Sequence, residues 1–351
     1  MTRPISVWNT VPTSAPAQRK DRYVPGSAAH PAKMHPGIAA HAIATYTRPG
    51  DLVLDPMCGI GTTLVEALHL GRNALGIEYE PIWATLASLN ARSAAQTSGT
   101  GTGIVRCGDA RRLTDLAPAS ARGEVALVVT SPPYGPSVHG QVRSSLETGE
   151  PGVVKKDFRY GHDRVNLAHV STDRLLEAFT EILAQCRTML RPGGTAVITT
   201  RPWRERGELI DLPSAVLAAG KAAGLLPTER CVAMLAGIRN SRLVTRPSFF
   251  QMKNVRDARR HGIPLSVVQH EDVLIFTRPG FARSSCEPKG GWGEPEGPIH
   301  PFPSVGAGVR RRPGGGHVDG PCEELASGVR VADRGARSMS KTAARCRGTA
   351  L

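Results

Sequence analysis

Apolar residues along this chain form two kinds of pattern that alternate with each other. Short continuous runs predict buried strands, at Leu52–Leu54, Ala74–Ile77, Ile104–Gly108, Val125–Val129, Thr195–Thr200, Leu226–Leu235 and Val273–Thr277. Between these runs, apolar residues at helical spacing predict helices at 37–46, 64–70, 81–95, 172–190 and 209–223. Strands that alternate with helices predict an α/β fold with a mostly parallel sheet, whose ligands bind at the carboxyl ends of the strands.

The two ends of the chain lack this periodicity. Residues 1–30 are rich in Pro, Ser, Thr and Ala, which predicts a flexible arm. Residues 281–351 contain runs such as GGWGEPEGP and RRRPGGGH, which predict a disordered tail without a core. We therefore expect one domain over residues 31–280.

A glycine-rich turn, DPMCGIGTT at residues 55–63, follows the first predicted strand and precedes a helix. The glycines allow close approach of a ligand to the backbone, and the helix start offers N–H groups to it. Glu78 ends the next strand about 20 residues after the turn begins, which is typical of an acceptor for ribose hydroxyls. Asp109 follows the third strand, where it could hold an adenine amine or cap the next segment.

A second turn, TSPPYG at residues 130–135, follows the fourth predicted strand. Its two prolines fix two φ angles and remove two N–H donors, so the carbonyls of Ser131 and Pro132 can face a ligand without competition. These acceptors lie beside the aromatic ring of Tyr134. A planar base with an exocyclic amino group matches this arrangement.

The net charge of +14 favours a polyanionic partner such as nucleic acid. Residues 136–170 and 237–263 are candidates for target recognition, and the second segment carries seven Lys and Arg residues against the single acid Asp257. The seven cysteines have no paired spacing, which predicts reduced thiols in a cytoplasmic protein and no structural metal. No apolar stretch is long enough to predict membrane insertion.

The two turns resemble motifs of one known family. DPMCGIGTT resembles the cofactor motif D-P-F-x-G-x-G-T of the class I S-adenosylmethionine-dependent methyltransferases, with Met57 in place of the common aromatic residue. TSPPYG resembles the catalytic motif [DNS]-P-P-[YFW] of the amino-group DNA methyltransferases within that class. The segment KMHP at 33–36 resembles their cofactor-flanking motif, and the resemblance covers about 31–280.

The resemblance implies a Rossmann-like fold with a mostly parallel, seven-stranded sheet, helices on both faces and an antiparallel last strand. It implies S-adenosylmethionine as the cofactor, with Asp55, Gly59 and Gly61 around its methionine and ribose. The expected cofactor-binding residues are Lys33, His35, Asp55, Pro56, Cys58, Gly59, Gly61, Thr62, Glu78 and Asp109. The expected catalytic residues are Ser131, Pro132, Pro133 and Tyr134.

The implied reaction is direct methyl transfer to the exocyclic amine of a flipped base in DNA. SPPY is more typical of N4-cytosine enzymes, so we expect site-specific cytosine methylation, as in a restriction-modification system. N6-adenine methylation of DNA and methylation of a guanine amino group in tRNA remain alternatives. A catalytically idle nucleic-acid-binding relative is a third, which the presence of Asp55, Glu78 and Ser131 disfavours.

Overall fold

The computed structural model describes residues 5–11, 13–99, 101–133, 141–143, 154–156, 160–161, 163, 166–205, 208–245, 247 and 249–280. The chain divides into two compact units, Met1–Glu287 and Pro288–Leu351, and the described residues all belong to the first. Tyr134, the expected tail at 281–351 and most of the candidate recognition segment 136–170 lie outside the described residues.

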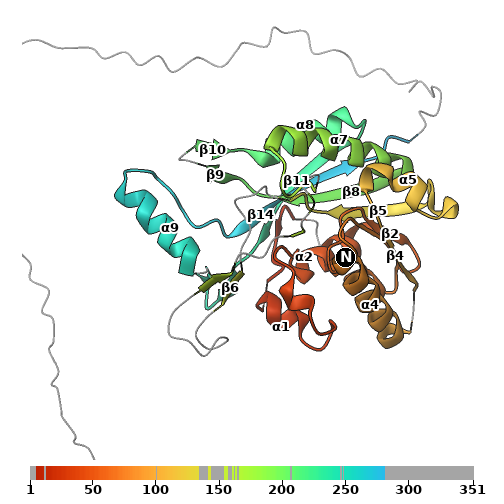
Figure 1. Cartoon of the computed structure of the whole chain (residues 1–351), viewed down its shortest axis with the longest axis horizontal. Helices are drawn as coiled ribbons and strands as arrows, with labels where there is room; N and C mark the ends of the chain where they lie inside the picture. The colour runs from red at the N-terminus through yellow and green to blue at the C-terminus, as the bar shows by residue number, and fades with distance from the viewer. Residues whose placement is uncertain are drawn as a thin grey trace, which may run out of the picture. The chain divides into compact units, whose positions relative to one another are not determined.

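The first unit is built around one sheet with the strand order β1-β11-β14-β8-β5-β2-β3-β4 (Figure 1). Its strands are β1 (Val7–Trp8), β2 (Leu52–Asp55), β3 (Asn73–Glu78), β4 (Gly103–Cys107), β5 (Val125–Thr130), β8 (Leu190–Thr200), β11 (Leu226–Met234) and β14 (His270–Thr277). The last strand, β14, runs antiparallel to both neighbours, and the other pairs in this sheet are parallel. The expected class I methyltransferase fold is therefore confirmed.

The main sheet has one strand more than expected, because β1 pairs with β11 at the sheet edge. Trp8 is only 2% exposed, and its ring lies 4.4 Å from that of His41. The burial of this large side chain holds the segment on the domain. For the described part of residues 1–30, the expectation of a flexible arm is therefore wrong.

Helices cover both faces of the sheet. The described helices of the chain are α1 (Ala15–Arg19), α2 (Pro36–Tyr46), α3 (Thr62–His69), α4 (Pro81–Ser98), α5 (Leu113–Leu116), α7 (Thr172–Met189), α8 (Leu212–Ala222) and α9 (Phe249–Arg260). Side chains of β5 alternate between two core clusters: Val128 packs with α5, α7 and α8, whereas Leu127 and Val129 pack with α2, α3 and α4. Figure 1 shows α7 and α8 on one face and α2 and α4 on the other.

Three two-stranded hairpins and three 3₁₀ helices complete the described elements. The hairpins pair β6 (Gln141–Arg143) with β7 (Val154–Lys156), β9 (Trp203–Glu205) with β10 (Glu208–Ile210), and β12 (Gly237–Arg239) with β13 (Arg242–Val244). The 3₁₀ helices are η1 (Ser27–Ala29), η2 (Ala110–Arg112) and η3 (Ala119–Ala121). Among the helices described, none has the length and apolar character needed to cross a membrane.

Candidate active site

A cavity of about 390 Å³ opens at the carboxyl ends of the central strands. Most of the expected site residues line it, although they come from five segments of the chain. These residues are Lys33, His35, Asp55, Pro56, Cys58, Gly59, Thr62, Glu78, Asp109, Ser131, Pro132 and Pro133. Of the other two expected residues, Gly61 does not line the cavity and Tyr134 is outside the described residues.

Asp55 is the last residue of β2, and its carboxylate is almost completely buried. Oδ2 accepts a 2.7 Å hydrogen bond from the hydroxyl of Thr63, and Oδ1 accepts one of 3.1 Å from the N–H of Met57. Burial raises the pKa of Asp55 to about 6, since the charged form loses its hydration. The carboxylate is thus held rigidly at the cavity wall.

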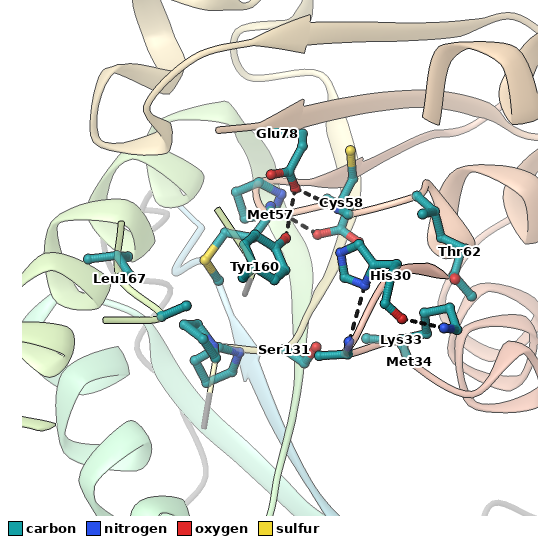
Figure 2. Close-up of a pocket in the computed structure, with 18 of the residues that line it drawn as sticks. His30, Lys33, Met34, Met57, Cys58, Thr62, Glu78, Ser131, Tyr160 and Leu167 are labelled. Carbon is teal, nitrogen blue, oxygen red and sulfur yellow. Dashed lines mark hydrogen bonds between the residues drawn. The ribbon is translucent and has the colours of Figure 1, made fainter. Parts of the chain in front are cut away.

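Glu78 is the last residue of β3 and is 1% exposed. Its Oε2 accepts hydrogen bonds from the N–H of Gly59 at 2.8 Å and from the hydroxyl of Tyr160 at 3.1 Å (Figure 2). Its Oε1 accepts a 2.9 Å bond from the N–H of Glu80. Burial raises the pKa of Glu78 to about 7. Both carboxylates therefore titrate close to neutral pH.

The two glycines of the first turn have different roles. Gly59 has a φ of +55°, and a Cβ built on it would lie 2.9 Å from Nε2 of His30, so a side chain there would collide with the cavity wall. Gly61 has a φ of +82° and is the N-cap of α3, where its backbone approaches Ala87 of α4. Gly61 thus shapes the turn and the packing of two helices, whereas Gly59 borders the cavity.

The segment that precedes α2 forms another wall of the cavity. The Lys33 ammonium donates to the carbonyl oxygens of His30 and of Ala28, the latter at 2.9 Å. Burial lowers the pKa of Lys33 to about 8. His35 is the N-cap of α2, and its Nδ1 accepts from the N–H of Gly37 at 3.3 Å. The hydrogen bonds of Lys33 and His35 thus hold this wall of the cavity in place.

His30 and Tyr160 line the cavity but were not among the residues expected from the sequence. The His30 ring contacts Tyr160 and Trp83 edge to face, with centroids 4.9 Å and 4.7 Å apart. Burial, with the nearby charge of Lys33, lowers the pKa of His30 to about 3, so its ring is neutral. The indole of Trp83 donates to the Tyr160 carbonyl at 2.8 Å. These contacts hold the Tyr160 hydroxyl against Glu78.

Asp109 has the capping role that its position in the sequence allowed, and it also borders the cavity. It lines the cavity and is also the N-cap of η2, where Oδ1 accepts from the N–H of Arg111 at 2.9 Å. Partial burial favours the neutral carboxyl, but the hydrogen bonds and charge of Arg111 outweigh it and hold the pKa of Asp109 below its ordinary value. Asp109 is therefore ionised at neutral pH.

The thiol of Cys58 is buried in the same region, 6% exposed. Burial raises the pKa of Cys58 well above its ordinary value, and the nearby carboxylates Glu78 and Asp55 add to the effect. A protonated thiol is a poor nucleophile. The four described cysteines are all free, and no group of three or more His, Cys, Asp or Glu side chains within the described part of the chain could hold a metal ion.

The Ser131-Pro132-Pro133 turn leaves the carboxyl end of β5, which lies in the middle of the sheet between β2 and β8. Asp55 and Glu78 end β2 and β3 on one side of the turn. The three residues of the turn line the same cavity as the two acids. The fold thus joins the two sequence motifs at one edge of the sheet.

Comparison with known proteins supports a relationship to DNA methylases. Residues 3–88 match a family model described as DNA methylase. The chain is 37% identical over 75 residues to the type II methyltransferase M.HinfI of Haemophilus influenzae, covering 21% of this chain and 20% of that protein. It is 30% identical over 64 residues to the type II methyltransferase M.MjaII of Methanocaldococcus jannaschii, covering 18% and 12%. The matches thus span one fifth or less of these relatives.

Among solved structures, TrmN from Thermus thermophilus is similar with a TM-score of 0.38 and 19% identity, over 72% of this chain and 50% of that one. This likeness is too distant to carry a functional argument. The family match lies at the amino-terminal part of the chain, which contains the glycine turn, Glu78 and the wall at residues 30–35. The resemblance predicted from the sequence is thereby confirmed over the matched part of the chain: residues 3–88 are related to the amino-group DNA methylases, which imply S-adenosylmethionine as the cofactor.

Proposed function

We propose that this protein is an S-adenosylmethionine-dependent DNA methyltransferase that methylates the exocyclic amine of a base, with N4 of cytosine as the target. One observation carries the proposal: two buried carboxylates, Asp55 and Glu78, line the same cavity as the Ser131-Pro132-Pro133 turn, whose two prolines have no N–H. The type II relatives add a context, which is site-specific modification in a restriction-modification system.

The residues around the cavity fit the cofactor that the family implies. Glu78 offers a buried acceptor for a ligand with hydroxyl groups, and Gly59 leaves no side chain in the way. Asp55 and Asp109 add negative charge, which suits a ligand with cationic groups and an amino-bearing ring. In this proposal Asp55 and Gly59 hold the methionine and ribose, Glu78 the ribose hydroxyls and Asp109 the adenine, while Pro56, Cys58 and Thr62 form the walls.

When bound, S-adenosylmethionine supplies an electrophilic methyl group on a sulfonium. The chain's own residues then align the base. The Ser131 hydroxyl and the Pro132 carbonyl accept the hydrogens of the amine, which directs its lone pair away from them. Pro133 has no N–H, so it leaves the Pro132 carbonyl free for the base. The expected stacking of the base on Tyr134 completes this arrangement. Direct transfer to the amine lone pair needs no covalent intermediate with the protein, and the protonated Cys58 thiol would be a poor nucleophile for one.

A basic surface supports nucleic acid as the partner. Helix α9, within the expected recognition segment 237–263, carries four cations and one acid: Lys253, Arg256, Arg259, Arg260 and Asp257. The β12–β13 hairpin adds Arg239 and Arg242, which are both exposed and directly paired across the strands. Clustered cations of this kind bind phosphates without regard to sequence. We assign DNA rather than RNA because the matched family is described as DNA methylase.

The proposal is tested by transfer of a tritiated methyl group from S-adenosylmethionine to unmethylated PCR-amplified DNA and, in parallel, to tRNA. Digestion to nucleosides then identifies the product. We expect N4-methylcytosine in DNA and a loss of about 100-fold in rate for Ser131→Ala, which removes one acceptor. Label found as N6-methyladenine would overturn the choice of cytosine, and label found only in tRNA would overturn the choice of DNA.

A further inference from the structure

The cavity continues past Ser131 to the opposite side of β5, away from the two acids. There it is lined by Thr199 and Arg201 at the end of β8, by Glu271 of β14 and by Leu235 just after β11. None of these residues belongs to either sequence motif. This region, which we call the far half of the cavity, has no role in holding the cofactor under the proposed function.

The register of the sheet fixes how these residues face each other. Thr130 of β5 pairs with Ile198 of β8, so Ser131 lies beside Thr199, one residue further along both strands. On the other side of β8, Thr200 pairs with Asp272 of β14, so Arg201 lies beside Glu271. Arg201 and Glu271 therefore lie level with each other on adjacent strands, two residues beyond the level of Ser131 and Thr199.

Arg201 and Glu271 form an ion pair in which Nη1 and Oε1 are 3.9 Å apart. Their side chains are 27% and 13% exposed, so both charges are largely withdrawn from water while they still border the cavity. A partly buried charge pair is costly to desolvate and adds little net stability. Its position beside the catalytic turn therefore points to a ligand.

We propose that the far half of the cavity is the base-binding subsite and that Arg201, positioned by Glu271, reads the Watson–Crick edge of the flipped base. This inference rests on the proposed function. A guanidinium presents two parallel N–H donors in a fixed fork. Cytosine carries two neighbouring acceptors, N3 and O2, next to its amine, whereas adenine carries one acceptor, N1, on that edge. The fork matches cytosine and leaves one donor unmatched with adenine.

The experiment compares the full-length protein with Arg201→Ala, Arg201→Lys and Glu271→Gln. The control is Arg191→Ala, which breaks an ion pair with Asp51 of 3.0 Å at the amino ends of the strands. Each protein is assayed for cofactor affinity by calorimetry, for kcat/KM on unmethylated PCR-amplified DNA, and for the ratio of N4-methylcytosine to N6-methyladenine in the product.

We expect all five proteins to bind S-adenosylmethionine with affinities within about twofold of each other. Arg201→Ala lowers kcat/KM by about 10- to 100-fold, which is the range of one bidentate base contact. Arg201→Lys keeps the charge but loses the fork of N–H donors, so its kcat/KM is also lower than that of the wild type. The kcat/KM of Glu271→Gln decreases less. The share of N6-methyladenine rises in both Arg201 variants, and Arg191→Ala matches the wild type.

Full activity in Arg201→Lys would overturn the proposal that Arg201 reads the base, because a positive charge alone would then be enough for the reaction. An unchanged kcat/KM or an unchanged product ratio in Arg201→Ala would also overturn the reading role. A loss of cofactor binding in Arg201→Ala would overturn it too, because that result would indicate a structural role for Arg201. An unaltered Glu271→Gln would overturn the positioning role of Glu271. If the wild-type protein transfers no methyl group to DNA, the proposed function itself fails, and that result is distinct from the others.

Discussion

The backbone N–H of Gly59 and the carboxylate of Glu78 are joined by a hydrogen bond of 2.8 Å, which ties the turn after β2 to the end of β3. Gly59 has a φ of +55°, and a Cβ at this position would lie 2.9 Å from Nε2 of His30. Glycine at this position therefore serves both the backbone conformation and the shape of the cavity.

We predict that Gly59→Ala costs more stability than Gly50→Ala. Gly50 has a φ of +86° with nothing within 4 Å of its Cβ position, so its substitution costs only the backbone strain, about 1 kcal/mol. Gly59→Ala adds a collision with the buried His30 ring and costs about 1–3 kcal/mol more. Urea denaturation of the two variants measures the difference. Equal losses of the free energy of unfolding would contradict the packing described here.

The raised pKa of Glu78 predicts opposite effects of pH on stability and on cofactor binding. Because the folded-state pKa of about 7 lies above the ordinary 4.5, the folded protein binds this proton more tightly than the unfolded chain. The stabilisation is complete below about pH 4.5 and is lost as the pH rises through 7. Ribose hydroxyls need an ionised acceptor, so cofactor affinity rises over the same interval.

This pH prediction is tested with Glu78→Gln, which cannot titrate. Calorimetry from pH 5.5 to 8.5 should show cofactor affinity that increases with pH in the wild type and changes much less in the variant. Denaturation over the same range should show a smaller fall of the free energy of unfolding in the variant. A wild-type affinity that is independent of pH would rule out Glu78 as an ionised acceptor in the complex.

Tyr160→Phe is predicted to strengthen cofactor binding. The Tyr160 hydroxyl donates to Oε2 of Glu78 at 3.1 Å, which is the acceptor that we assign to the ribose. Without this competitor the affinity increases about fivefold, corresponding to one hydrogen bond of about 1 kcal/mol. The control is Tyr46→Phe, at the end of α2 and away from the cavity. Weaker binding by Tyr160→Phe would show that the hydroxyl contacts the cofactor instead.

The ion pair between Arg22 and Glu66 predicts that the amino-terminal segment supports the site. Nη2 of Arg22 and Oε2 of Glu66 are 3.0 Å apart, and the Glu66 side chain is only 4% exposed. Arg22→Ala leaves a buried carboxylate without its cation, which costs about 3 kcal/mol. Since burial already raises the pKa of Glu66, protonation relieves part of this cost, and the loss is larger at pH 8 than at pH 5.

The matched control for Arg22 is Arg112→Ala, whose ion pair with Asp115 is exposed on both sides and contributes less than about 1 kcal/mol. Thermal denaturation compares the two variants, and calorimetry measures cofactor affinity. We expect that affinity to fall only for Arg22→Ala, because the segment after Arg22 continues into the cavity wall at His30 and Lys33. Equal changes of stability and of cofactor affinity in the two variants would contradict the prediction that the amino-terminal segment supports the site.

The parts of the fold that the sequence predicted are those with a local cause. Buried strands appear as continuous apolar runs, and the turns after β2 and β5 appear as glycine and proline motifs. Strand β1 has two residues, too few for any periodicity, and its pairing with β11 spans more than 200 residues. It could not be predicted from local pattern.

The candidate site shows the same division. Asp55 and Glu78 follow from the spacing of one turn, but His30 and Tyr160 meet only because separate loops pack on Trp83. The spacing of Gly59 and Gly61 also does not indicate which glycine borders the cavity. The contact of Arg201 with Glu271 depends on the insertion of β14 between β8 and β11, an arrangement that the separate motifs do not contain.

The position of β5 in the strand order has a consequence for how such a protein changes over time. The acids assigned to the methyl donor lie at the ends of β2, β3 and β4. The residues assigned to the base lie at the end of β8 and the start of β14, and the Ser131 turn lies between the two groups. Substitutions at Arg201 or Glu271 can therefore alter the preferred base while the donor-binding residues stay intact. Specificity can evolve in one half of the cavity without a loss of the chemistry in the other.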